Sequence, residues 1–164
     1  IWMENMNAYL GSIIQQHPEV TFEILLPSPH ISYWTQMKED KFTKSMNIYQ
    51  KTVDLLEEYS NVLVFYCGQE EWLNYNRNNY GNDIFAINEG IAAYMLRASF
   101  CDREYLVQSD TMKTALDNLQ MVVIREKTNP LTYADLSDWD IVLLGDSIIG
   151  LENTIEYLLK TFRR

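Results

Sequence analysis

The sequence predicts an α/β fold in which helices flank a parallel sheet. Two short apolar runs, 20–26 and 62–66, are typical of buried strands, and a long amphipathic helical pattern lies between them. A third apolar run occupies 141–144. Because these runs are apolar at almost every position, both faces of each strand are expected to be covered, as in parallel sheets joined by helical crossovers.

Length and charge narrow the class of protein. The 164 residues are enough for one globular domain, and 47% of them are hydrophobic. The 13 basic and 23 acidic residues give a net charge of −10, which repels a phosphate backbone, so no nucleic-acid partner is expected. No apolar run approaches the roughly 20 residues that a membrane helix needs, so no transmembrane segment is expected. Two cysteines and two histidines show no zinc-like spacing, and neither a metal nor a cofactor is predicted.

The first half of the chain predicts a helix, a strand, a helix and a strand in that order. Apolar residues recur at helical spacing over 2–13, up to Pro18. The strand at 20–26 stops at Pro27, and a long helix with one apolar face covers 42–56 before the strand at 62–66.

The second half predicts further helices and one more strand. Glu70 and Glu71 suit the first turn of a helix better than a metal site. The stretch 74–83, rich in Asn and Tyr, reads as a loop, either an ordinary one or one that recognises a glycan. Helices are expected over 91–96 and over 112–122, the latter with Asp110 as its N-cap, and a closing helix over 151–162.

The strongest signal for chemistry is the turn that follows the third apolar run. Gly145 and Asp146 carry the chain from the strand at 141–144 to Ser147 and a following helix. A serine at the carboxyl end of a parallel strand lies where α/β sheets bind ligands, with free backbone N–H groups nearby to stabilise an oxyanion. Ser147 is therefore a candidate nucleophile. The alternative is that Asp146 or Ser147 only caps the helix.

The strand at 141–144 followed by Gly145, Asp146 and Ser147 resembles the nucleophile motif of the SGNH, or GDSL-type, serine esterases and acyl hydrolases. In that family a late loop carries an Asp and, three residues on, the catalytic His; here 83–90 is similar to that loop, with Asp83 in place and Ala86 at the histidine position. The segments 24–30 and 61–65 also resemble the fourth and fifth strands of bacterial SGNH proteins related to teichoic-acid D-alanylation factors.

The resemblance implies a three-layer, flavodoxin-like fold and an ester hydrolase or acyltransferase that acts on acyl esters of a bacterial envelope polysaccharide or lipid. Ser147 would attack the acyl carbon, its N–H would help to hold the oxyanion, and Asp83 would orient the family histidine. The compartment, cell envelope or cytoplasm, is left open. A receiver-like or nucleotide-binding domain is a weaker alternative, because no Gly-rich phosphate loop or basic pocket is expected from the sequence.

The order of the motifs departs from the family pattern, since the Asp83 block precedes the Ser147 block. Residues 1–126 resemble the carboxyl-terminal half of such a domain, 127–139 form a connection, and 140–164 hold the nucleophile strand and its helix. The family's second and third strands have no counterpart. We expect a permuted or truncated piece, which a first residue Ile1 also suggests, with a gap beside the strand at 20–26 that a partner chain or swapped copy fills.

Ala86 leaves the predicted triad without its base. His30, which leaves its strand at the same edge as Ser147, is the candidate replacement; a strand-exit histidine without a catalytic role is the simpler interpretation. The second hypothesis is therefore a catalytically inactive SGNH-like binding or assembly module.

Overall fold

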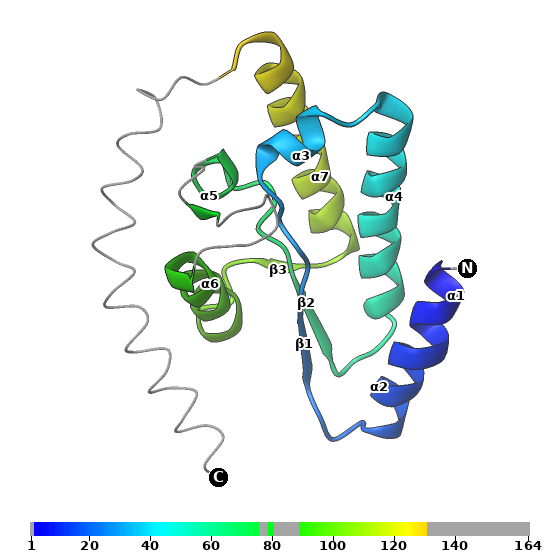
Figure 1. The fold of residues 1–164 in the computed structure, drawn as a ribbon. Helices are drawn as coiled ribbons and strands as arrows, with labels where there is room; N and C mark the ends of the chain where they lie inside the picture. The colour runs from blue at the N-terminus through cyan, green and yellow to red at the C-terminus, as the bar shows by residue number, and fades with distance from the viewer. Residues whose placement is uncertain (1, 76–78, 81–88, 131–164) are drawn as a thin grey trace.

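The computed structural model describes residues 2–75, 79–80 and 89–130 (Figure 1). Within these ranges an N-terminal helical stretch, α1, η1 and α2, leads to β1 and then to α3, α4 and β2. The chain continues through α5, α6 and η3 to β3 and α7. The bounds are α1 Trp2–Met6, the π-helical turn η1 Asn7–Gly11, α2 Ser12–Gln16, β1 Phe22–Leu25, α3 Ile31–Thr35, α4 Glu39–Leu56, β2 Val62–Phe65, α5 Glu71–Tyr75, α6 Glu89–Leu96, the π-helical turn η3 Arg97–Cys101, β3 Leu106–Val107 and α7 Ser109–Thr128.

The sheet has the order β1-β2-β3. Strands β1 and β2 are parallel, with Phe22 opposite Val62 and Leu25 opposite Phe65, which confirms the predicted pair of strands joined by a long helix. Strand β3 is antiparallel to β2, so the expectation of a purely parallel sheet is wrong. Among the described residues β1 pairs only with β2, and the predicted gap beside β1 stays a prediction because 141–144 lies outside the described ranges.

Strand β3 runs antiparallel because the chain reverses just before it. Arg103 adopts φ 61°, the left-handed region that residues with a side chain rarely occupy. Its guanidinium pairs with Glu23 of β1 and lies 5.5 Å from the ring centroid of Phe65. These contacts across the sheet hold the reversal in place. Two residues are too short to give an apolar run, so β3 left no signal in the sequence.

Helices cover both faces of the sheet, because successive side chains of β2 point to opposite sides. Val64 and Tyr66 face the side of α2, α4 and α7, whereas Phe65 and Cys67 face the side of α5 and α6 (Figure 1). The described part is therefore an α/β arrangement with a covered sheet, as the apolar runs predict. None of the helices described here combines the length and the hydrophobicity that a membrane span requires.

The helix ends agree with the predictions in part. Helix α5 begins at Glu71, which confirms the predicted helix start. The proposed cap at Asp110 is wrong: α7 begins at Ser109 and its N-cap is Gln108, which forms a capping box with Thr111. Asp110 lies in the first turn, where its carboxylate accepts from the Thr111 N–H at 2.7 Å. Helix α7 also runs to Thr128, into the predicted connection at 127–139.

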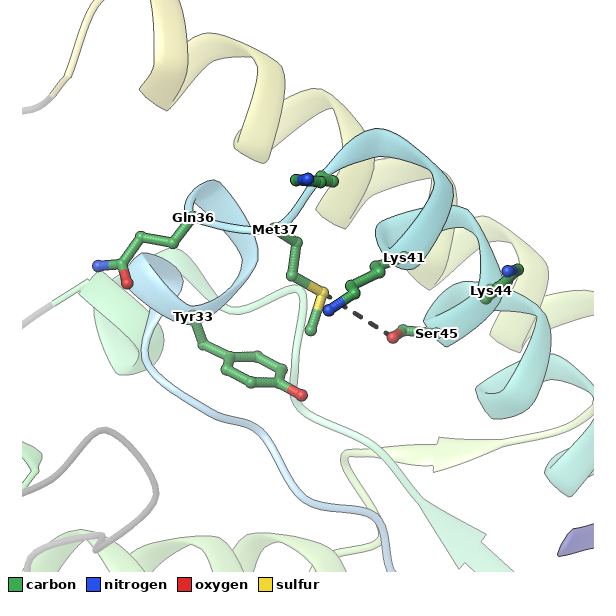
Figure 2. A pocket seen from close by; sticks show the side chains of 7 residues that line it. Tyr33, Gln36, Met37, Lys41, Lys44 and Ser45 are labelled. Atoms are coloured by element: carbon green, nitrogen blue, oxygen red, sulfur yellow. Dashed lines mark hydrogen bonds between the residues drawn. The ribbon is translucent and has the colours of Figure 1, made fainter.

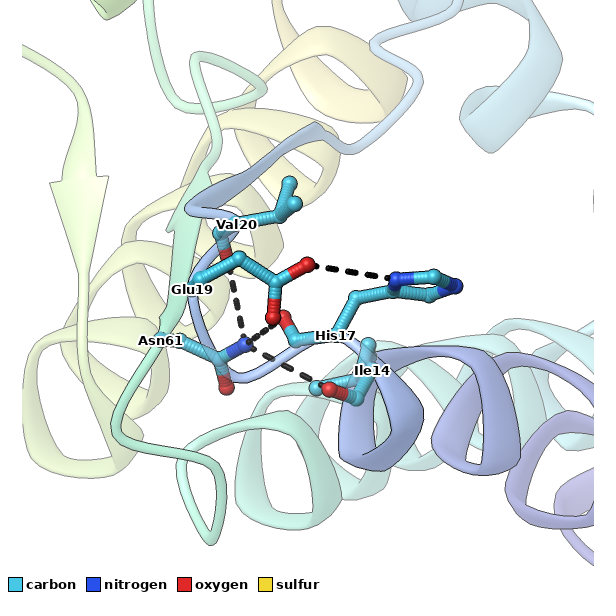
Figure 3. Close-up of polar contacts among 5 residues, drawn as sticks. All are labelled: Ile14, His17, Glu19, Val20 and Asn61. Carbon is cyan, nitrogen blue, oxygen red and sulfur yellow. Dashed lines mark hydrogen bonds and ion pairs between the residues drawn. The ribbon is translucent and has the colours of Figure 1, made fainter.

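Asn61 links α2 to the entry of β1, at the end of the sheet where β1 and β2 begin (Figure 3). Its amide nitrogen, whose two hydrogens are shared among three acceptors, lies within hydrogen-bond distance of the carbonyl oxygens of Ile14 at 3.4 Å, His17 at 3.1 Å and Val20 at 2.9 Å. The Asn61 carbonyl in turn accepts from the Phe22 N–H at 2.8 Å. One residue before β2 thus holds the end of α2 and the entry of β1 together.

Candidate functional site

The carboxyl ends of β1 and β2 carry a buried group of polar side chains. Ser28 and His30 follow β1, Cys67 follows β2, and Asn74 and Tyr80 close over them. We call these five residues the carboxyl-edge cluster. All five are buried, at most 9% exposed. In α/β folds ligands bind outside the carboxyl ends of parallel strands, which makes this cluster the candidate site.

Asn74 organises the cluster. Its amide nitrogen lies within hydrogen-bond distance of the carbonyl oxygens of Cys67 at 3.1 Å, Gly68 at 2.9 Å and Glu70 at 2.9 Å. Its amide oxygen faces the Tyr80 hydroxyl at 3.0 Å, and the same hydroxyl lies 2.8 Å from the Ser28 carbonyl. A single hydroxyl proton is shared between these two acceptors. The network joins the loops after both strands to Tyr80, which lies 52 residues after Ser28.

His30 acts as a helix cap in this arrangement. It is the N-cap of α3, and its Nδ1 accepts from the Ser32 N–H at 3.1 Å, with the Ser32 hydroxyl at 2.9 Å. Its ring meets Tyr80 edge to face, with centroids 5.2 Å apart. Because Nδ1 accepts a backbone hydrogen bond, the proton of the neutral ring sits on Nε2, which is then a donor. In this tautomer neither ring nitrogen offers a free lone pair to a substrate or a serine.

The other titratable groups of the cluster hold their protons near neutral pH. Burial raises the pKa of the Cys67 thiol to about 11, and its sulfur lies 3.5 Å from the Ser28 hydroxyl. Burial also raises the pKa of Tyr80 and of the neighbouring Tyr66. A thiol that stays protonated is a weak nucleophile. These side chains therefore serve as neutral hydrogen-bonding groups.

The second histidine lies at the other end of β1. His17 follows α2 and is more than half exposed, with Nδ1 3.4 Å from a Glu19 carboxylate oxygen (Figure 3). A hydrogen bond to its own backbone N–H, and then the contact with His17, lower the pKa of Glu19. The parallel strands separate His17 from the carboxyl-edge cluster.

Most of the predicted catalytic residues fall outside the described ranges. Asp83, Ala86, Gly145, Asp146 and Ser147 are among them, so their roles stay predictions. His30 is described and lies at the predicted edge. Tyr80, which precedes Asp83 by three residues, is anchored at that same edge through the Ser28 carbonyl.

Sequence reasoning missed the structural role of the Asn-rich stretch. Asn74 and Asn79 are each 3% exposed, and the amide of Asn79 donates to the Leu73 carbonyl at 3.0 Å. These buried amides satisfy backbone carbonyls of α5 and of the segment between β2 and α5, which favours a structural role for Asn74 and Asn79 over glycan recognition. Asn74 lies within α5, so the predicted loop over 74–83 begins too early. The signal in the sequence that indicates this structural role is an asparagine within a few residues of a strand end.

Comparison with protein-family models, with curated proteins and with solved structures finds no match. Within the described ranges, no three His, Cys, Asp or Glu residues gather closely enough to hold a metal ion. The family interpretation therefore depends on the sequence motifs.

Proposed function

We propose that this chain is a catalytically silent SGNH-type module, which keeps the edge of the fold that meets acyl-ester or glycan ligands but lacks hydrolytic turnover. The observation that carries the proposal is that neither of the two histidines in the sequence is placed to act as a base. Nδ1 of His30 accepts the Ser32 N–H and so caps α3, and His17 lies at the opposite end of β1. With Ala86 at the family's histidine position, Ser147 has no imidazole to accept its proton.

The second candidate is a serine ester hydrolase or acyltransferase of the same type, acting on acyl esters of an envelope polysaccharide or lipid. The Gly145-Asp146-Ser147 turn after an apolar run favours it, because a nucleophile and an oxyanion-binding N–H belong at that position. In this case His30 would change tautomer and release the Ser32 N–H before it served as a base, with Asp83 as an orienting residue.

Turnover of p-nitrophenyl acetate distinguishes the two functions. The silent module predicts equal rates for the natural chain, Ser147→Ala and His30→Gln. A rate that Ser147→Ala abolishes would refute silence, and a matching loss in His30→Gln but not in the control His17→Gln would identify His30 as the base. Introducing a base through Ala86→His is expected to raise the rate if the remaining oxyanion donors are present, since removing a triad member typically costs several orders of magnitude.

Binding is tested separately, with amide NMR shifts recorded during titration by an O-acetylated methyl glucoside and by its deacetylated parent. Shifts at Ser28, Cys67 and Gly68 that saturate with the acetylated sugar alone support an acyl-ester site. Equal shifts with both sugars, or none, would contradict it.

A further inference from the structure

A basic hollow lies where α3 meets α4. It has a volume of about 670 Å³, and its lining includes Tyr33, Met37, Lys38, Lys41, Lys44 and Ser45. We call it the lysine hollow. Every residue that lines it is neutral or basic, although Glu39 and Asp40 lie between two of the lysines in the sequence. In Figure 2, Tyr33 from α3 and Lys41 from α4 point toward the same space beside Met37.

The three lysines follow one another at one helical turn. Lys38 precedes the first residue of α4, and Lys41 and Lys44 follow at intervals of three residues. At 100° and 1.5 Å per residue, Lys41 and Lys44 lie about 60° apart around α4 and roughly 4.5 Å apart along it, and Lys38 is the N-cap before the first turn. This spacing creates a row of positive charge. The row is not apparent in the sequence, where acidic residues stand between two of the lysines.

The lysines of this row are not held in ion pairs within the described part of the chain. Each arginine that the structure describes is within ion-pair distance of a carboxylate: Arg97 of Asp102, Arg103 of Glu23 and Arg125 of Glu71. By contrast, none of the described lysines, the three of the hollow included, lies within ion-pair distance of a described carboxylate. The hollow is distinguished by bringing three of these cations together in a chain of net charge −10, and this concentration of positive charge attracts anions locally.

The floor of the hollow is rigid and partly apolar. Tyr33 packs edge to face on Trp34 at 5.0 Å, and Trp34, which is 1% exposed, packs in the same way on Phe42 at 6.0 Å. Met37 belongs to the same hydrophobic cluster, and its sulfur accepts from the Ser45 hydroxyl at 3.9 Å. The lysines therefore project beside a surface that packing has already fixed.

We propose that the lysine hollow binds an oligophosphate ester that carries a flat ring, such as a nucleoside triphosphate. Lysine ammonium groups bind phosphate as point charges, and a row of three suits several linked phosphates better than one. Tyr33 and Met37 offer the ring an aromatic face and a polarizable thioether. This site does not depend on the acyl-ester function proposed above, and it supplies the basic pocket that the sequence did not reveal.

Calorimetric titration of the whole chain at fixed ionic strength tests the proposal, with tripolyphosphate, ATP and adenosine as probes. ATP is expected to bind saturably and more tightly than tripolyphosphate, which lacks the ring. Lys41→Gln/Lys44→Gln is expected to weaken ATP binding about tenfold or more, because each lost contact is a charge-assisted hydrogen bond. Lys51→Gln/Lys113→Gln is the matched control: it removes the same charge from exposed helical positions outside the hollow and should change affinity less than twofold.

Three results would overturn the proposal. One is the absence of saturable ATP binding. Another is an equal loss in the control pair, which would mean a general response to net charge. The third is flotation with phosphatidylglycerol vesicles without ATP binding, which would make this face a docking surface for an anionic membrane. Tyr33→Leu, checked for folding by circular dichroism, should remove the advantage of ATP over tripolyphosphate and leave tripolyphosphate binding unchanged.

Discussion

Replacing Asn74 by alanine would remove the side chain that joins the two loops of the carboxyl-edge cluster. Of the three carbonyls that face its amide, those of Cys67 and Glu70 also accept backbone hydrogen bonds, from the N–H groups of Glu70 and Asn74. The Gly68 carbonyl has no other donor among the described residues. One buried acceptor is thus left unsatisfied.

The expected loss of unfolding free energy follows from that count. An unsatisfied buried acceptor costs about 1–3 kcal/mol, and losing the contact with the Tyr80 hydroxyl adds about 0.5–1.5 kcal/mol. The better helix propensity of alanine within α5 returns about 0.5 kcal/mol. Asn74→Ala should therefore destabilise the chain by roughly 1–4 kcal/mol.

Urea unfolding followed by tryptophan fluorescence measures this difference, because Trp34 is 1% exposed in the folded chain and reports the loss of packing. The control Asn47→Ala makes the same chemical change at an exposed position of α4 and should alter stability by less than about 0.5 kcal/mol. Combining Asn74→Ala with Tyr80→Phe should give a loss smaller than the sum of the two, since both remove the same contact. If Asn74→Ala proved as mild as Asn47→Ala, or the double variant strictly additive, the network would not contribute as argued.

Three further predictions concern residues outside the cluster. Asn61→Ala should cost about 1–2 kcal/mol in the same assay, because its contacts are partly exposed and water replaces some of them; an unchanged midpoint would contradict this. In the folded chain, a thiol reagent at pH 8 should label Cys101, which is partly exposed, and reach the buried Cys67 only in denaturant; two reactive thiols under native conditions would be the contrary result. Because the pKa of Glu19 is lowered in the folded state, its contribution to stability is present above its ordinary pKa and is lost as the pH falls through the lowered one. Glu19→Gln should thus be less stable than the natural chain at neutral pH and match it in acid; a difference that persisted in acid would have another cause.

The sequence predicts the elements whose signal is local and repeated. The apolar runs that became β1 and β2, and the helical periodicity of α4, each span several residues that share one environment. Helix α3 has no such signal: it is five residues long, it follows two prolines, and its cap is His30, a residue type that seldom caps helices. Strand β3 depends on the reversal at Arg103 and on a contact with Glu23, 80 residues earlier, which no local pattern encodes.

The sequence predicts where His30 lies but not the hydrogen bond that it forms. The rule that ligands bind at the carboxyl ends of parallel strands places His30 at the right edge. It does not say that Nδ1 of His30 would be used on the Ser32 N–H, because that depends on where α3 begins. In the same way, Asn74 and Tyr80 are residue types common in loops, and their burial depends on tertiary contacts. Tyr80 contacts the carbonyl of Ser28, 52 residues earlier, and Asn74 contacts the carbonyls that follow β2.

Substitutions of His30 separate a structural role of this residue from a catalytic one. His30→Asn should preserve the N-cap of α3 but would remove any imidazole base. Asparagine is among the best N-cap residues and can accept the Ser32 N–H, so His30→Asn should keep the cap, whereas His30→Ala should lose about 1 kcal/mol more because it has no acceptor. Both variants lose the edge contact with Tyr80, so the difference between them isolates the cap. Equal stability of the two variants would show that the imidazole contributes nothing as a cap. An ester-hydrolysis rate that fell in both would show that the ring acts as a base, since asparagine restores the hydrogen bond but cannot accept a proton at neutral pH.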